Sequence, residues 1–366
     1  MRFLLTLAMA ALPVCAQTST LDFLNHNRPV LDAHNCYPYK GEWSDRIERA
    51  LGTGFPVGIE QDMAWYVDPA TRKGRAVVSH TAKATGSEPL LRDYFFERVR
   101  PIVEKALKDN DRARWPLIVV HFDFKDNQAP LLHAVWDILG EYQGWITTAV
   151  KTADPRALAP FEPKPLLVLT EDPDEQEEVF FRQVPVGGQL RLFGSAHTKA
   201  IPAKPKEQHD HLLATLPPEE LLPEPPTNYR RWWNNSWHAV EEGGQHQAGA
   251  WTAADDRRLR ALVDRAHQLG YWIRFYTLDG FGRGEDRGWG YNYNFGSRDA
   301  VMARWKAALA AGVNLIASNQ YEELATPCWR RPGRAARTAA PACWRCARFS
   351  ARSTFPSSSR CRRTTC

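Results

Sequence analysis

The chain has 366 residues, enough for one large domain or two smaller ones, and a formal net charge of +5. That charge is unevenly distributed, because residues 327–366 contain ten Arg and no Lys, Asp or Glu, and without them and Arg2 the balance becomes −6. A mildly acidic folded part gives no reason to expect nucleic-acid binding. Of the seven cysteines, only Cys36 lies between residue 16 and that basic segment, so the sequence excludes a disulfide framework.

The chain begins like a secretory signal peptide. A single positive charge at Arg2 precedes an apolar run over residues 3–12, and small side chains before Gln17 offer a cleavage point. The run is too short to span a bilayer, and no later segment is long and apolar enough to do so. We therefore expect residues 1–16 to be removed. The mature protein is expected to be a soluble monomer, secreted or periplasmic, with at most peripheral membrane contact.

Strand-like and helix-like segments then alternate along the chain. Short apolar runs bounded by turn residues predict eight strands, at 30–35, 58–64, 116–125, 165–171, 190–196, 234–240, 272–279 and 313–319. Apolar spacing and cap residues predict helices between most of them, at 90–110, 129–142, 173–184, 252–270 and 297–311. This alternation favours a (β/α)8 barrel, the TIM barrel, over a doubly wound sheet, because no glycine-rich phosphate fingerprint follows the first strand.

Two irregular stretches interrupt the alternation without dividing the domain. The Pro-rich residues 201–227 and the Gly-, Arg- and Tyr-rich residues 280–296 are interpreted as long loops over the barrel mouth. Residues 17–326 are therefore predicted to form one catalytic barrel domain.

The C-terminal segment 327–366 differs from everything before it. It consists mainly of Arg, Ala, Ser, Pro and Cys without apolar periodicity, so we expect a disordered Arg- and Cys-rich tail. This composition favours a frameshift product, translated from GC-rich DNA in the wrong frame, with a genuine basic extension as the alternative. Because the chain enters the tail soon after the eighth strand, the last helix of the barrel is expected to be incomplete or missing.

Acidic and imidazole side chains gather at the ends of the first predicted strands. Glu60 and Asp62 are two residues apart, so they face the same side of one strand, and Asp123 adds a third carboxylate from the next. Carboxylates that face one another repel unless a cation lies between them, and oxygen ligands favour a hard ion such as Mg²⁺ or Ca²⁺. His34 and His80 flank the carboxylate pair in sequence and are candidates for general acid and general base.

Further polar residues extend this candidate site. Lys125 shares a strand face with Asp123 and offers a positive charge to an anionic ligand. His121 lies on that same face, and the sequence leaves open whether it lines the site or is structural. In the seventh and eighth strands, Tyr276 and Asn319 are placed near the mouth of the barrel as substrate-binding candidates.

This pattern resembles the phosphoinositide-specific phospholipase C-like phosphodiesterase superfamily, which includes glycerophosphodiester phosphodiesterases and sphingomyelinase D-type toxins. The resemblance covers residues 30–125 in detail and residues 126–325 only in topology. It implies a TIM barrel, two catalytic histidines and a set of metal ligands. On the matching positions these are the histidines His34 and His80 and the ligands Asn35, Glu60, Asp62 and Asp123.

Position 35 bears on the substrate. Asn35 resembles the calcium ligand of eukaryotic phospholipases C and replaces the phosphate-binding Arg of glycerophosphodiesterases, which puts that substrate in doubt. The pair Asp123 and Lys125 resembles the sphingomyelinase D form, or the Glu-x-Lys of glycerophosphodiesterases. Asn35 favours Ca²⁺, whereas the set of three carboxylates favours Mg²⁺. The sequence therefore leaves the choice between Ca²⁺ and Mg²⁺ open.

The resulting prediction is a metal-dependent phosphoric diester hydrolase, an enzyme acting on a phospholipid head group or related phosphodiester by His/His acid–base catalysis. Two alternatives remain open: a catalytically inactive metal-containing barrel that binds a ligand, and metal-dependent hydrolysis of non-phosphate esters. The sequence does not decide between a cyclic phosphate and a hydrolysed product.

Overall fold

The computed structural model describes residues 29–39, 42–244, 249–282, 285 and 294–329. Within them, eight parallel strands form a closed ring, in the order β1-β12-β11-β10-β9-β7-β4-β2 with β2 pairing back to β1. The strands are β1 (Val30–Ala33), β2 (Val57–Val67), β4 (Ile118–Phe124), β7 (Leu166–Thr170), β9 (Phe193–Ser195), β10 (Arg230–Ser236), β11 (Trp272–Tyr276) and β12 (Leu315–Ser318). The predicted (β/α)8 TIM barrel is confirmed.

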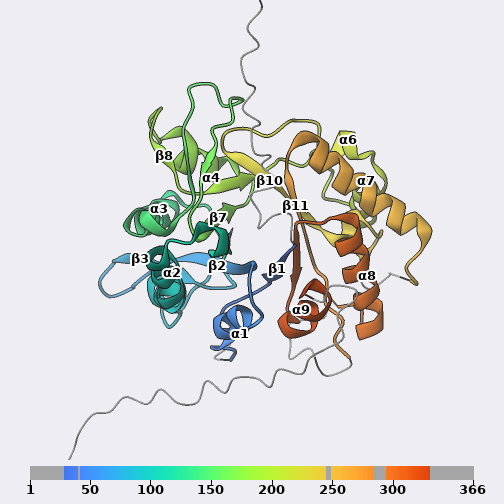
Figure 1. Ribbon diagram of the computed structural model, residues 1–366, viewed down its shortest axis with the longest axis horizontal. Helices are drawn as coiled ribbons and strands as arrows, with labels where there is room; N and C mark the ends of the chain where they lie inside the picture. The colour runs from blue at the N-terminus through green and yellow to red at the C-terminus, as the bar shows by residue number, and fades with distance from the viewer. Residues whose placement is uncertain (1–28, 40–41, 245–248, 283–284, 286–293, 330–366) are drawn as a thin grey trace, which may run out of the picture. The chain divides into compact units, whose positions relative to one another are not determined.

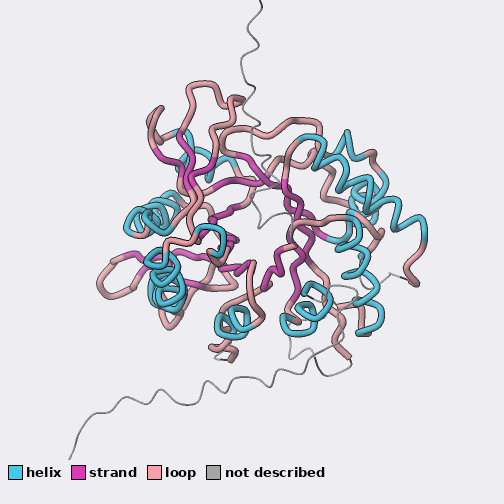
Figure 2. The backbone as a smooth tube through the Cα atoms, in the orientation of Figure 1, coloured by secondary structure: helices cyan, strands magenta, loops and turns pink. Residues whose placement is uncertain are grey.

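Helices surround this ring of strands (Figures 1 and 2). They are α1 (Arg46–Gly52), α2 (Glu97–Asp109), α3 (Ala129–Glu141), α4 (Asp174–Glu177), α5 (Lys206–Thr215), α6 (Pro218–Leu221), α7 (Ala253–Leu269), α8 (Arg298–Ala311) and α9 (Tyr321–Trp329). π-Helical turns precede α2, at Arg92–Phe96, and follow α4, at Glu178–Arg182. The expected start of α7 is observed, because Thr252 and Asp255 form a reciprocal capping box.

Additional short strands lie outside the ring. β3 (Gly74–Val78) pairs antiparallel with the long β2 and leads directly to His80. A separate antiparallel sheet is formed by β5 (Thr148–Val150), β6 (Phe161–Glu162) and β8 (Gln189–Leu190). The hairpin of β2 and β3 therefore carries a histidine to the barrel from a strand that does not belong to the ring.

The registers of the strands align the polar residues of the interior. Glu60 on β2 is opposite His121 on β4, and Asp62 is opposite Asp123. On the outer side of β4, Val120 and Phe122 are fully buried against the helices. Both faces of these strands are thus covered, as a parallel sheet requires, and the inward face is free to hold polar groups at its C-terminal end.

The sixth barrel strand was predicted four residues too late. The prediction was 234–240, whereas β10 spans Arg230–Ser236 and the chain turns into a 3₁₀ helix at Trp237. Arg230 and Arg231, two adjacent charged residues, lie before the predicted start of this strand. In the structure both are buried, because Arg230 pairs with Glu177 at 2.6 Å and Arg231 donates to the carbonyl oxygen of Ala159.

The last helix of the barrel is present, so the expected loss of this element was wrong. α9 follows β12 directly and contacts β1. Tyr321 and Leu324 on this helix are fully buried, and Glu322 forms an ion pair with Arg49 at 2.7 Å. Apolar side chains one turn apart are enough to seat a short helix on the barrel wall.

The predicted ends of the domain are only partly described. α9 continues past residue 326, up to Trp329, while residues 1–28 and 330–366, which include the predicted signal peptide and most of the predicted tail, lie outside the described residues. The predicted loop 201–227 carries α5 and α6, and much of 280–296 is not described. Among the described residues, no helix is long and apolar enough to cross a membrane.

Candidate functional site

A cavity of about 250 Å³ opens at the C-terminal ends of the barrel strands. Eight of the ten predicted site residues line it, together with three that the sequence analysis did not select. The lining residues are His34, Asn35, Glu60, His80, His121, Asp123, Lys125, Glu171, Asn234, Arg274 and Tyr276. The other two predicted residues, Asp62 and Asn319, are buried behind this lining with exposed fractions of 0% and 3%.

Three carboxylates converge as the spacing predicted. One oxygen of each of Glu60, Asp62 and Asp123 lies within 4.8 Å of the others. Lys125 Nζ is 2.7 Å from Asp62 Oδ2 and 2.8 Å from Asp123 Oδ2, so part of the negative charge is already balanced. The second oxygen of Asp62, Oδ1, is buried without a hydrogen-bond partner in the described part of the chain. An acceptor left in this way is suited to a cation that binds oxygen.

His80 is held by two neighbours. Its Nδ1 is 3.0 Å from Asp62 Oδ2 and 2.8 Å from the hydroxyl of Tyr37. The same hydroxyl donates to Asp62 and lies 2.6 Å from the side-chain oxygen of Asn35. A carboxylate at Nδ1 fixes the tautomer of a histidine and leaves Nε2 as the ring atom that takes a proton.

His34 carries its proton on the other ring nitrogen, Nε2. The amide nitrogens of Asn35 and Asn319 lie 3.2 and 3.3 Å from its Nδ1, and its Nε2 is 3.7 Å from Glu60. Two amide donors at Nδ1 place the proton of the neutral ring on Nε2. Burial lowers the pKa of His34 well below its ordinary value, and the charges of Arg274 and Lys125 act in the same direction. His34 is therefore neutral near pH 7.

Asn319 supports His34 from behind rather than facing the cavity. Its amide nitrogen donates to Asp279 Oδ2 at 2.7 Å, and its backbone N–H donates to the other oxygen of the same carboxylate. Burial raises the pKa of Asp279, and the hydrogen bonds from Asn319 oppose this shift. In this geometry Asn319 contacts the ring of His34, and its predicted contact with substrate stays a prediction.

Arg274 is the most consequential residue that the sequence analysis did not select. It lies two residues before Tyr276 on β11, with 1% of its surface exposed. Its guanidinium donates to Glu60 Oε2 at 2.7 Å and to Asn234 Oδ1 at 3.0 Å, and it also contacts Asp32. Same-face spacing with Tyr276 was the signal that could have identified it.

Glu171 and Asn234 complete the opposite wall of the cavity. His121 Nε2 is 2.6 Å from Glu171 Oε1, and Asn234 donates to the same carboxylate at 2.9 Å. Burial and the charge of Arg274 lower the pKa of His121, but the pairing with Glu171 and the charge of Glu60 together outweigh them, so that the pKa is raised. Glu171 could have been selected from the sequence, because it is the last residue of the predicted strand 165–171. Asn234 could not, because the sixth strand was predicted to begin at this residue, whereas it lies near the end of β10.

Comparison with known proteins adds little to this geometry. No protein-family model matches the chain, and a search of curated proteins finds no significant match. Among solved structures, the chain is similar to a calcium-dependent phosphoinositol-specific phospholipase C from Pseudomonas sp., with 11% identity, coverage of 83% of this chain and 92% of that one, and a TM-score of 0.41.

Two further structures match at a similar level. A hyperthermophilic endo-β-1,4-glucanase shows 13% identity, covers 82% of this chain and 91% of its own, and has a TM-score of 0.39. The HPPK-DHPS protein of Plasmodium falciparum shows 11% identity, with 83% of this chain and 46% of that one covered and a TM-score of 0.38. These scores are low and the three activities differ, so any assignment of function depends on the residues of the site.

Proposed function

We propose that this protein is a divalent-metal-dependent phosphoric diester hydrolase that acts on a phospholipid head group or a related phosphodiester outside the cytoplasm. The observation that carries the proposal is the convergence of three carboxylates, two histidines and a lysine around one cavity at the C-terminal end of the barrel. This is the end where TIM-barrel enzymes hold their catalytic groups. The motif over residues 30–125 supports the same reading.

The residues present fit a hard divalent ion. Glu60, Asp62 and Asp123 would hold it with the side-chain oxygen of Asn35, since the three carboxylates already present oxygens within 4.8 Å of one another. The buried Asp62 Oδ1, which has no hydrogen-bond partner among the described residues, supports the same fit. When bound, Mg²⁺ or Ca²⁺ supplies charge neutralisation at a phosphoryl oxygen.

The two histidines would play different parts. His80, oriented by Asp62 through Nδ1, would take the proton of the attacking hydroxyl at Nε2. This proton transfer contributes about 10²- to 10⁴-fold to the rate, and the protonated His80 would then give the proton to the leaving oxygen. The neutral His34 would hydrogen-bond an oxygen of the substrate through the N–H of Nε2, because Nδ1 faces two amide groups. Lys125 provides the positive charge that draws the phosphodiester anion to the cavity.

A panel of phosphodiesters tests the proposal directly. The purified protein is assayed on a phosphoinositide, a lysophospholipid, a glycerophosphodiester and a nitrophenyl diester, with and without chelator. We expect turnover of at least one substrate, its loss in chelator, and its return with Mg²⁺ or Ca²⁺ rather than Zn²⁺. Turnover that persists in excess chelator rejects the metal, and inactivity on every diester in the presence of metal rejects the phosphodiesterase.

A pair of histidine variants controls for contaminating activity. His80→Ala is expected to lose about two to four orders of magnitude in kcat. His209→Ala changes a histidine on α5 that does not line the cavity and is expected to retain full activity. Equal rates for the two variants would show that the activity does not arise in this cavity.

A further inference from the structure

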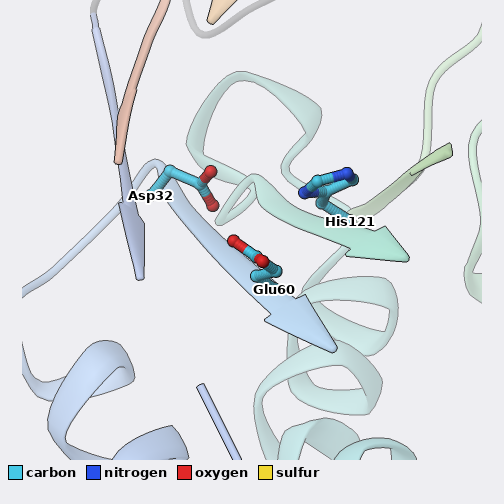
Figure 3. Close-up of side chains that lie close together, drawn as sticks. All are labelled: Asp32, Glu60 and His121. Atoms are coloured by element: carbon cyan, nitrogen blue, oxygen red, sulfur yellow. The ribbon is translucent and has the colours of Figure 1, made fainter. Parts of the chain in front are cut away.

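A second cluster of potential ligands lies deeper in the barrel than the carboxylates considered so far. Asp32 on β1, Glu60 on β2 and His121 on β4 point toward one another (Figure 3). One ligand atom of each lies within 4.8 Å of the others, and their exposed fractions are 0%, 3% and 1%. Glu60 is common to both clusters, so two ions bound at once would share it.

Two atoms of the deeper cluster have no hydrogen-bond partner in the described part of the chain. These are Asp32 Oδ1 and His121 Nδ1, both fully shielded from solvent. The carboxylate of Asp32 packs directly on the backbone of β2, where a Cβ at Gly58 would come within 2.3 Å of Oδ1. Gly58 is thus required for Asp32 to lie where it does. Buried polar atoms without a partner lower the stability of the fold unless a nearby charge compensates them.

The compensating charge is the guanidinium of Arg274. Nε donates to Asp32, and Nη2 donates to Glu60 Oε2 at 2.7 Å. Nη1 donates to Asn234, and this third hydrogen bond fixes the plane of the guanidinium. Arginine keeps its proton even when fully buried, so the positive charge at this position is permanent.

We propose that Arg274 is a cation built into the protein at the position where a second divalent ion would otherwise bind to Asp32, Glu60 and His121. By occupying that position it limits the cavity to one exchangeable ion, at Glu60, Asp62 and Asp123. This inference goes beyond the proposed function and does not depend on which ester is the substrate.

The stoichiometry of Mn²⁺ tests the proposal, since Mn²⁺ accepts both carboxylate and imidazole ligands and its binding can be counted by electron paramagnetic resonance. Arg274→Ala is expected to bind one more Mn²⁺ per chain than the unmodified protein. Arg274→Lys, which retains a positive charge, is expected to bind the same number as the unmodified protein. Adding Asp32→Asn to Arg274→Ala should remove the extra ion, because Asp32 belongs only to the deeper cluster.

The difference of one ion is the decisive quantity. A folded Arg274→Ala variant that binds no additional Mn²⁺ overturns the proposal, and so does an extra ion that survives the Asp32→Asn change. If Arg274→Ala fails to fold alone, Mn²⁺ should restore a cooperative thermal transition by replacing the lost charge, and its failure to do so also overturns the proposal. Failure of the phosphodiesterase assay leaves this count unaffected.

Discussion

A single hydroxyl, that of Tyr37, connects the proposed proton carrier to the proposed metal ligands. It lies 2.8 Å from His80 and 2.6 Å from both Asp62 and Asn35, and the whole side chain is buried. Burial raises the pKa of Tyr37 well above its ordinary value, and the neighbouring Asp62 adds to the shift. The hydroxyl is therefore a fixed dipole that holds the ring of His80 and two oxygen ligands in one arrangement.

Tyr37→Phe should consequently lower kcat by about 10- to 100-fold with little change in KM, because a displacement of the proton carrier affects the chemical step more than binding. Loss of the hydroxyl is also expected to destabilise the fold by about 1–3 kcal/mol. Steady-state kinetics and denaturant titration measure the two effects. Tyr229→Phe is the matched control, since the buried Tyr229 hydroxyl has no hydrogen-bond partner within the described residues. An equal fall in kcat for both variants would contradict this role of Tyr37.

Spacing along one strand was the part of the site that could be predicted. Glu60 and Asp62 share a face of β2 because side chains alternate, and the partner strand places Asp123 opposite. The position of Arg274 could not be obtained in this way, because its contacts to Asp32 and Glu60 depend on how the ring of strands closes. The sequence indicates which side chains share a face of one strand. Only the closed barrel shows which strand faces meet in the interior.

At the scale of elements, α9 shows how little sequence is needed to complete the barrel. The helix contacts the first strand, Tyr321 and Leu324 are fully buried, and the Tyr321 hydroxyl donates to the carbonyl oxygen of His34 at 2.7 Å. The expectation of a missing helix gave too much weight to the composition that follows it. The burial of two side chains in one helical turn stabilises this helix, although the sequence that follows it has no apolar periodicity.

Leu324→Ala is therefore expected to cost about 2–5 kcal/mol, since it leaves a cavity under a fully buried helix face. Thr326→Ala, at an exposed position of the same helix, should have almost no effect. Thermal or chemical denaturation of the two variants compares them. Similar stabilities would mean that α9 does not support the barrel.

At the scale of the whole molecule, ion binding should be visible as thermal stability. A ligand that binds only the folded state at 100 times its Kd adds about 2.7 kcal/mol to the free energy of unfolding. Mg²⁺ or Ca²⁺ should therefore raise the Tm of the unmodified protein, and the rise should disappear in Asp123→Asn. Asp174→Asn removes a carboxylate from a separate, more exposed acidic group with Glu177 and His197, and should preserve the rise. Calorimetry that shows the same rise in Asp123→Asn would place the ion elsewhere.

The closure of the ring also determines when the site comes into existence. β1 is hydrogen-bonded to both β2 and β12, and the backbone N–H of His34 donates to the carbonyl oxygen of Ser318. The hydrogen bonds of the first strand are therefore complete only when the last strand, at the other end of the barrel domain, is in place. Contacts of such long separation form late in folding, because the loop between them must be closed first. A chain still being synthesised therefore holds the histidines and carboxylates of the candidate site apart, and the site is complete only after the final strand has been made.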